Sequence, residues 1–306
     1  MWTVLAFVSA LCLGCYDISK KAALRSNSVA DVLTVSICVS AIILAVPLLI
    51  SRCAPQMLEG TLFFVPEMSL KGHLFTLLKS LIVLSSWIFA YMSLKHLPIS
   101  VVSPMQATRP MWTLVGALLL FNERLNIWQW TGVLLAIGTV FVFSLRNRNE
   151  IRREKTDARY YVCLVLAILI GACSGLYDKY LMRRFDHNAV QVYYTLYQAV
   201  MMLVIWFVHK VRHGQSASVK ENLAALQSVP AVILISVFLI ISDNVYMLAL
   251  SDPDSLIAVV STIRRGGAVI GFAYGLLFLK EKDPLHKILC MAGICAGLIC
   301  LAIGSV

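Results

Sequence analysis

The chain has 306 residues, of which 59% are apolar and only 14% are charged. Soluble domains are roughly 45 to 50% apolar and about 25% charged, so this composition excludes an ordinary soluble domain and predicts an integral membrane protein. The net charge of +10 would indicate a nucleic-acid partner in a soluble protein. Here most Lys and Arg lie in short segments between apolar runs, where they set membrane orientation, so no nucleic-acid partner is expected.

Ten apolar runs are long enough to cross a bilayer as helices, which takes about 20 residues each. They cover, in chain order, residues 2–24, 31–51, 73–94, 98–120, 126–145, 160–182, 188–209, 230–250, 254–279 and 284–304. The first run is interpreted as a retained span, because no Lys or Arg precedes it and no small-residue cleavage site follows it, as a signal peptide requires.

The chain contains its own half twice. With an offset of 158 residues, Glu123 falls on Glu281. With an offset of 161 residues, the pattern Gly-x-Tyr-Asp at residues 14–17 falls on the same pattern at 175–178. Because five spans are an odd number, the second copy must enter the membrane from the opposite side. The predicted fold is therefore an all-α membrane protein of ten transmembrane helices, arranged as two inverted five-helix repeats. Its parts are a first repeat 1–145, a polar linker 146–159 and a second repeat 160–306.

Several short motifs carry a resemblance to a known family. They are Leu94-Lys-His-Leu-Pro98, Ser103-Pro104, Leu118-Leu-Leu-Phe-Asn-Glu123-Arg124 and Gly132 to Gly138 in the first half, and Tyr246-Met-Leu-Ala-Leu, Ser261 to Gly267 and Phe278-Leu-Lys-Glu281-Lys282 in the second. This pattern resembles the EamA-type repeat of the drug/metabolite transporter superfamily, although Thr262 and Ala268 replace the prolines found at 104 and 110. The resemblance implies a secondary transporter of small metabolites, with a central cavity lined mainly by the third, fourth, eighth and ninth helices. It does not imply a substrate.

Three arginines lie near the middle of predicted spans: Arg109 in the fourth, and Arg264 and Arg265 in the ninth. Each costs roughly 2.5 to 3.5 kcal/mol at that depth, so each needs a reason to be there. A guanidinium matches a carboxylate or phosphate bidentately, which favours a binding site for an anionic group. The alternatives are an ion pair with Asp243 or capping of carbonyls freed by prolines. Adjacent residues of a helix point about 100° apart, so we expect at most one of Arg264 and Arg265 to face the cavity centre.

Asp243, in the eighth span, is the only acidic residue that is expected deep in a span. It is a candidate proton-coupling carboxylate, and a structural ion pair with an arginine is the alternative. Lys79 in the third span is expected to extend its amine toward the membrane surface. Asp17 and Asp178 are expected to pair with Lys or Arg on their own helices.

The remaining site candidates are polar or aromatic. Gln106 lies beside the arginine layer, and Trp87, Tyr91 and Tyr246 supply aromatic faces on the third and eighth helices, as do Tyr193 and Tyr197 on the seventh. Packing or anchoring at the membrane interface is the alternative for each aromatic. Glu123 and Glu281 are interpreted as structural caps that lock the short turns after the fourth and ninth helices.

These observations favour a secondary transporter for an anionic or zwitterionic metabolite, such as an amino acid, organic acid or sugar phosphate, with a proton as the hypothetical coupling ion. The alternatives are an exporter of neutral or cationic drug-like compounds, a non-transporting scaffold or receptor, and an intramembrane enzyme. The enzyme hypothesis lacks any paired acidic, His-x-x-x-His or Gly-x-Ser-x-Gly motif. Cys12 and Cys15 are interpreted as packing residues, so no metal or cofactor is expected.

Orientation and location are further predictions. Lys and Arg number 16 in the connections after odd-numbered spans and 6 after even-numbered ones. The positive-inside rule then places the 146–159 linker in the cytoplasm and both termini outside, whereas the family resemblance implies cytoplasmic termini. We follow the charge count. The expected partners are the lipid bilayer and a small-molecule substrate. The expected state is a monomer or weak dimer in a bacterial-type inner (plasma) membrane.

Overall fold

The fold is known from a computed structural model of the chain, which describes residues 1–24, 29–96, 105, 108–146, 158–212, 229–267, 269–270 and 284–304. Within these residues the secondary structure is entirely helical. The helices are α1 (Trp2–Leu24), α2 (Val29–Cys53), the short 3-10 helix η1 (Pro55–Met57), α3 (Leu70–His96), α5 (Arg109–Leu120), α6 (Ile127–Arg146), α7 (Ala158–Met182), α8 (His187–Arg212), α10 (Val229–Ser251), α11 (Ile257–Arg265) and α13 (Pro284–Gly304).

Eight of the predicted spans coincide with these helices to within three residues at either end. The fourth and ninth spans are represented by α5 and α11, and the rest of each predicted span lies largely outside the described residues. Six helices, α1, α2, α3, α7, α8 and α10, are long and apolar enough to cross a membrane, judged within the described part of the chain. Long apolar helices satisfy their own backbone hydrogen bonds, which is what the interior of a bilayer demands.

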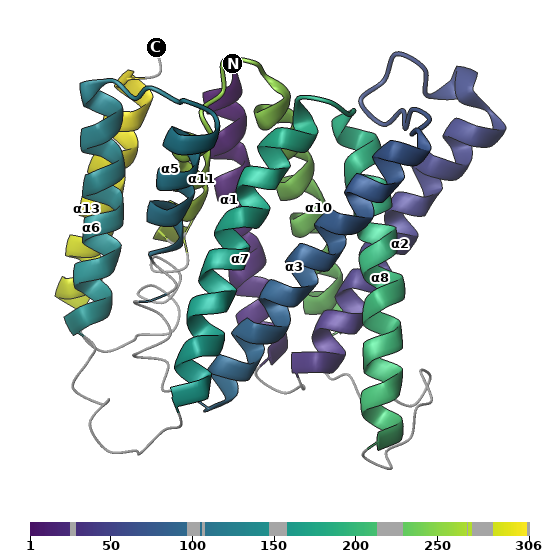
Figure 1. Ribbon diagram of the computed structural model, residues 1–306, viewed down its shortest axis with the longest axis horizontal. Coiled ribbons are helices and arrows are strands. Elements are labelled where there is room, and N and C mark those ends of the chain that lie inside the picture. Colours follow the sequence, from purple (N-terminus) through teal and green to yellow (C-terminus); the bar gives the residue numbers. More distant parts are fainter. Residues whose placement is uncertain are drawn as a thin grey trace.

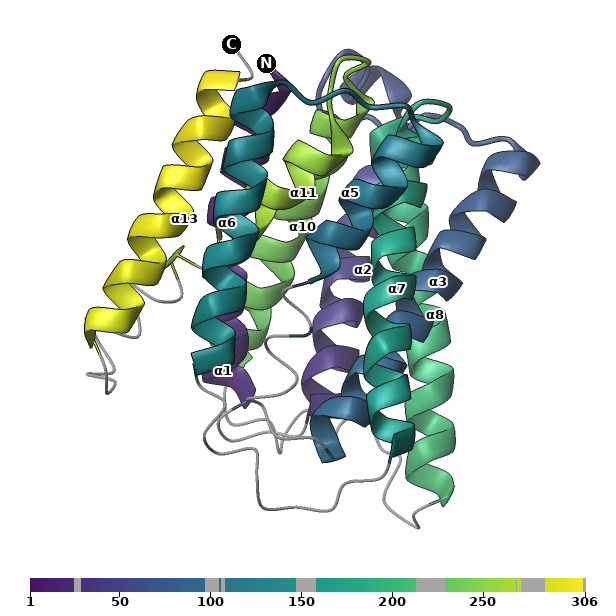
Figure 2. The ribbon, with the colours of Figure 1, turned by 60° about the vertical axis from the view of Figure 1, so that its left-hand side comes forward.

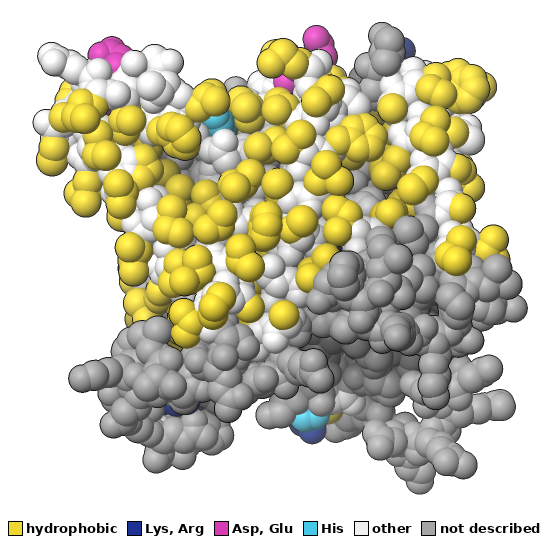
Figure 3. Space-filling view, turned by 180° about the vertical axis from the view of Figure 1, so that it is seen from behind, with side chains coloured by type: hydrophobic (Ala, Val, Ile, Leu, Met, Phe, Trp, Pro, Cys, Tyr) yellow, Lys and Arg dark blue, Asp and Glu magenta, His cyan; other side chains and the backbone are white. Residues whose placement is uncertain are grey.

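The outer surface is apolar, as a membrane protein requires. Figure 3 shows apolar side chains spread over the described part of one face, with acidic groups near one edge. Large side chains such as Leu119, Leu120 and Val142 are more than half exposed. A patch this extensive on a soluble protein would cause aggregation, whereas lipid tails solvate it.

The helices pack as a few close pairs. The most extensive contacts join α1 to α10, α6 to α13, α3 to α7 and α2 to α8, and α5 lies against both α7 and α11. Figure 1 shows α6 and α13 side by side at one edge, and Figure 2, turned by 60°, shows the same pairing. The beginning of α1 and the end of α13 lie at the same end of the bundle.

Small residues allow these close approaches. A side chain at Gly132 of α6 would come within 2.7 Å of the Gly297 carbonyl oxygen of α13, and one at Gly14 of α1 within 2.7 Å of the Gly267 carbonyl oxygen. Helices in membranes associate largely through such small-residue contacts, because lipid provides no hydrophobic driving force between them. The pairs bring α1, α3, α5, α7, α10 and α11 around one central space.

Candidate membrane-embedded binding site

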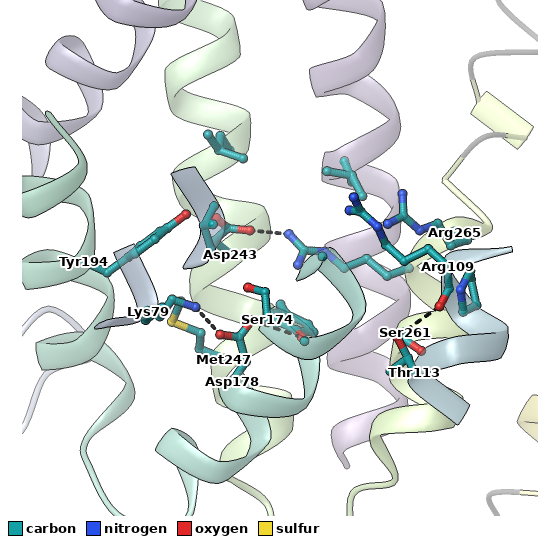
Figure 4. Close-up of a pocket in the computed structure, with 18 of the residues that line it drawn as sticks. Lys79, Arg109, Thr113, Ser174, Asp178, Tyr194, Asp243, Met247, Ser261 and Arg265 are labelled. Carbon is teal, nitrogen blue, oxygen red and sulfur yellow. Dashed lines mark hydrogen bonds and ion pairs between the residues drawn. The ribbon is translucent and has the colours of Figure 1, made fainter. Parts of the chain in front are cut away.

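A cavity of about 250 Å³ lies between α1, α3, α5, α7, α10 and α11, with Tyr194 of α8 completing its wall. Four cationic and two acidic side chains line it, which is unusual inside a bundle of apolar helices. They are Lys79, Arg109, Arg264, Arg265, Asp178 and Asp243. Figure 4 shows the carboxylates of Asp178 and Asp243 in one part of the cavity and Arg109 with Arg265 in another. The cavity is therefore polarised, with an acidic part and a cationic part.

Two ion pairs occupy the acidic part. Lys79 of α3 pairs with Asp178 of α7, and Arg264 of α11 pairs with Asp243 of α10. Tyr246 links the two pairs, since its hydroxyl donates to Asp178 Oδ2 at 3.4 Å and its ring lies 4.2 Å from the Arg264 guanidinium carbon. The side chains of Lys79 and Asp178 are only 3% and 10% exposed, so this pair is nearly sealed from solvent.

Arg109 and Arg265 form the cationic part. Arg109 Nη2 donates to the Ala167 carbonyl oxygen at 3.2 Å and to Ser86 Oγ at 3.5 Å, while its buried Nε has no hydrogen-bond partner among the described residues. Within the described chain no carboxylate lies within 4.0 Å of either guanidinium. Four cations and two carboxylates line the described cavity, and 4 − 2 leaves a net charge of +2.

Local sequence explains where these arginines stand. Arg109 begins α5 and is followed by Pro110, a residue that the first turn of a helix tolerates because its missing N–H needs no partner there. Arg264 and Arg265 end α11, where cations are favoured by the negative end of the helix dipole. Because α5 and α11 are packed together, the start of one helix and the end of the other bring all three guanidinium groups to one cavity.

Comparison with known proteins gives the family. The model of the EamA-like transporter family matches residues 1–145. Residues 1–145, a little under half of the chain, are therefore similar to this family. A solved structure named "Crystal structure of protein" aligns with 99% of this chain and 96% of that chain, with a TM-score of 0.73 and 12% sequence identity, and at that identity the likeness concerns the fold alone. No curated protein matches the chain.

This match confirms the resemblance predicted from sequence for the first half of the chain. Together with the six long apolar helices, it indicates a multi-pass integral membrane protein. The charged cavity between the helices is therefore the candidate binding site of the chain.

Six of the predicted site residues line this cavity: Trp87, Arg109, Asp243, Tyr246, Arg264 and Arg265. Gln106 lies outside the described residues, and so does the side chain of Tyr91. Both Arg264 and Arg265 line the cavity, and which of them faces its centre stays a prediction. A guanidinium on a long flexible stem reaches the cavity even when its Cα points partly away.

The predictions for Lys79 and Asp178 were also wrong. Lys79 does not extend to the membrane surface but is buried against Asp178, and Asp178 pairs across helices instead of along its own. Asp243 is consequently not the only deep carboxylate of the described chain. The repeated Gly-x-Tyr-Asp pattern pointed to Asp178, but the partner lies 99 residues away on another helix, and helix spacing alone does not reveal such a contact.

The aromatic predictions divide in two. Trp87 and Tyr246 line the cavity, whereas Tyr193 and Tyr197 turn away from it. Tyr193 accepts a hydrogen bond from Arg52 at 3.1 Å, and the Tyr197 hydroxyl lies 2.9 Å from His73 Nδ1. The residue that sequence reasoning missed is Tyr194, the immediate neighbour of Tyr193, because one step along a helix rotates a side chain by about 100°.

Glu123 positions the arginine-bearing helix α11. Its carboxylate accepts hydrogen bonds from the backbone N–H groups of Ile257 at 2.7 Å and Ala258 at 3.2 Å, which are the first two residues of α11. The predicted role was to lock the turn that follows α5. A reciprocal capping pair, Asn126 with Gln129, serves that turn instead, at 2.9 and 3.0 Å. Glu123 thus ties the first half of the chain to the helix that carries Arg264 and Arg265, and Glu281 lies outside the described residues.

Replacing Glu123 with Gln should loosen this attachment. An amide oxygen lacks the charge of the carboxylate, and its NH2 group faces backbone donors, so a buried N–H loses its acceptor. We expect Glu123→Gln to lower the free energy of unfolding by about 1 to 3 kcal/mol, measured by thermal unfolding of the purified protein in detergent. Glu59→Gln, the same change at an exposed position, is the matched control. Equal shifts in the two variants would contradict the capping role.

Proposed function

We propose that the chain is a ten-span secondary transporter that moves a small anionic or zwitterionic metabolite by alternating access between two inverted halves, residues 1–145 and 160–306. The bilayer proposed for it is a bacterial-type inner membrane. The observation that carries the proposal is a cavity lined by Arg109 and Arg265, whose guanidinium groups have no described carboxylate within 4.0 Å.

The pattern of helix contacts supports the inverted repeat. If α1 corresponds to α7 and α3 to α10, then exchanging the halves turns the α1–α10 pair into the α7–α3 pair, and both are among the most extensive contacts. If α2 likewise corresponds to α8, α5 to α11 and α6 to α13, the exchange turns the α1–α11 contact into the α7–α5 contact. It turns each of the pairs α6–α13, α2–α8 and α5–α11 into itself. Termini at the same end of the bundle suit an even number of spans. Inverted halves of this kind move against each other in known transporters.

The charge balance supports an anionic or zwitterionic substrate. Uncompensated charge in a low-dielectric interior is costly, so Arg109, whose Nε is buried without a partner among the described residues, favours an occupant that carries a carboxylate or phosphate. Arg265 is more exposed and adds a second positive charge to the same cavity. The carboxylates of Asp178 and Asp243 lie in the other part of the cavity, where an ammonium group would find an acceptor (Figure 4). Amino acids, organic acids and sugar phosphates all meet one or both requirements.

Counterflow into proteoliposomes tests the proposal directly. The probes are radiolabelled L-alanine, succinate and glucose 6-phosphate, with glucose as a neutral compound and ethidium as a cationic one. We expect exchange of at least one of the first three and of neither control. Exchange of glucose or ethidium alone would favour an exporter of neutral or cationic compounds. A folded protein that exchanges none of the five would favour a non-transporting scaffold.

Removing the guanidinium of Arg109 or Arg265 should weaken the binding of the transported anion. We expect Arg109→Gln to cost about 2 to 5 kcal/mol of apparent affinity, or about 30-fold or more, the range for truncating one partner of a buried charged contact. Arg265 is more exposed, so Arg265→Gln should cause a smaller loss of affinity. Apparent affinity is read from the concentration dependence of counterflow. Arg212→Gln, at an exposed position outside the cavity, is the control. Arg264→Gln is less informative, because it leaves Asp243 without its partner. Unchanged affinity in both cavity variants would make the arginines structural.

The space around the Arg109 guanidinium offers a second test, in which no charged residue is replaced. A Cβ at Gly171 would overlap the Arg109 guanidinium, whereas one at Gly175, a turn further along α7 and also on the cavity wall, would meet nothing within 4 Å. Gly171→Ala should therefore displace the guanidinium from the Ala167 carbonyl and reduce affinity for the anion at least tenfold, the effect of about 1.4 kcal/mol. Gly175→Ala should leave affinity within about twofold. Similar affinities would show that the position of Arg109 is unimportant.

A further inference from the structure

The Lys79–Asp178 pair differs from the other ion pair in what it connects. Lys79 lies on α3 in the first half of the chain and Asp178 on α7 in the second, so this pair joins the two halves at the wall of the cavity. Arg264 and Asp243 both belong to the second half. A movement of the halves against each other would leave the Arg264–Asp243 pair intact, but it would strain or break the Lys79–Asp178 pair.

The two pairs also differ in acid–base chemistry. A guanidinium keeps its proton under all ordinary conditions, so Asp243 faces a permanent cation. The ammonium of a buried lysine is a compact charge that changes partner or protonation state far more readily. Among the cations that line the described cavity, Lys79 is the only lysine, and its partner is Asp178.

The groups around the Lys79–Asp178 pair come from four helices. Lys79 faces it from α3, Tyr246 and Asp243 from α10, and Arg264 from α11, while the Tyr194 ring of α8 lies 4.6 Å from Lys79 Nζ. Tyr16 of α1 and Arg109 of α5 complete the polar wall of the cavity. An anionic group entering beside Lys79 would meet Asp178 as a like charge, and a like charge nearby favours the protonated form of a carboxyl group.

We propose that the Lys79–Asp178 pair is where proton binding is coupled to anion binding, an inference that rests on the proposed function. When the anionic group enters, Lys79 Nζ exchanges the Asp178 carboxylate for the incoming anion. Asp178 takes one proton from the aqueous phase that the cavity faces. One anionic charge and one proton enter together, so the net charge of the site stays the same. The ion pair that joins the halves is broken only in the doubly loaded state.

Linkage gives this step a measurable signature. If anion binding is accompanied by uptake of one proton, the anion must bind more tightly at lower pH, by up to about tenfold per pH unit. Asp178→Asn imitates the protonated carboxyl group permanently. The variant should therefore bind the anion without taking up a proton, and its affinity should hardly depend on pH.

Isothermal titration calorimetry of the purified full-length protein tests the inference. Each of L-alanine, succinate and glucose 6-phosphate is titrated at pH 6, 7 and 8 in two buffers with different enthalpies of ionisation, which counts the protons taken up per anion bound. For the wild type we expect uptake of up to about one proton. For Asp178→Asn we expect none, with an affinity at pH 8 close to that of the wild type at pH 6. Asp254→Asn, the same change at an exposed position outside the cavity, is the matched control and should keep the uptake, and Asp243→Asn is titrated beside it. Protons that the probe itself takes up or releases contribute equally for every variant, so they cancel when the variants are compared.

Each result decides between the proposals. Anion binding by the wild type without proton uptake, or unchanged uptake in Asp178→Asn, overturns the coupling inference and leaves the anion site standing. If only Asp243→Asn loses proton uptake, coupling is assigned to Asp243 and the inference for Asp178 is overturned as well. If none of the probes binds to folded wild-type protein, the proposed anion site is wrong and the inference falls with it. If Asp178→Asn does not fold, the double variant Lys79→Gln/Asp178→Asn, which removes both charges of the pair together, must lose the uptake for the inference to stand.

Discussion

The cost of placing charge inside a low-dielectric interior is the constraint on which this molecule depends. Six ionised side chains line one cavity between apolar helices, and each ion requires several kcal/mol of compensation from its surroundings. Two carboxylates compensate two of the cations. Arg109 relies on a carbonyl and a hydroxyl group, and Gly171 provides the space for its guanidinium. The proposed affinity for an anion rests on the same deficit, because an anionic occupant would supply the compensation that the described residues do not.

The six charges are not shared equally between the two halves. The first half contributes Lys79 and Arg109, both cationic, while the second contributes Arg264 and Arg265 together with both carboxylates. The first half therefore presents an uncompensated positive surface, and the second half a balanced one. Contacts between the halves neutralise part of this surface: Asp178 reaches across to Lys79, and the Ala167 carbonyl reaches across to Arg109. Electrostatics thus helps to hold together two repeats whose outer surfaces are apolar.

Sequence reasoning located the helices because a span is defined by a continuous apolar run, which is a local property. It also found Arg109, Arg264, Arg265 and Asp243, because a charge within such a run stands out against its neighbours. It failed wherever the direction of a side chain decided the outcome, as with Lys79 and with the choice between Tyr193 and Tyr194. A helix of a soluble protein has a polar face that reveals which side is buried, but lipid is as apolar as a helix interface, so that signal is absent here. The capping of α11 by Glu123 was missed for a related reason, since donor and acceptor lie 134 residues apart.

Rigid-body motion of two halves divides polar contacts into those within a half, which persist, and those between halves, which must exchange. The Arg264–Asp243 pair belongs to the first kind and fixes the last turn of α11 relative to α10. The Lys79–Asp178 pair and the Glu123 cap belong to the second kind. Breaking a buried ion pair without a substitute leaves two uncompensated charges and is strongly unfavourable. Under the proposed mechanism, the halves separate only when other groups compensate the charges of Lys79 and Asp178, and an anion together with a proton is the smallest combination that compensates both.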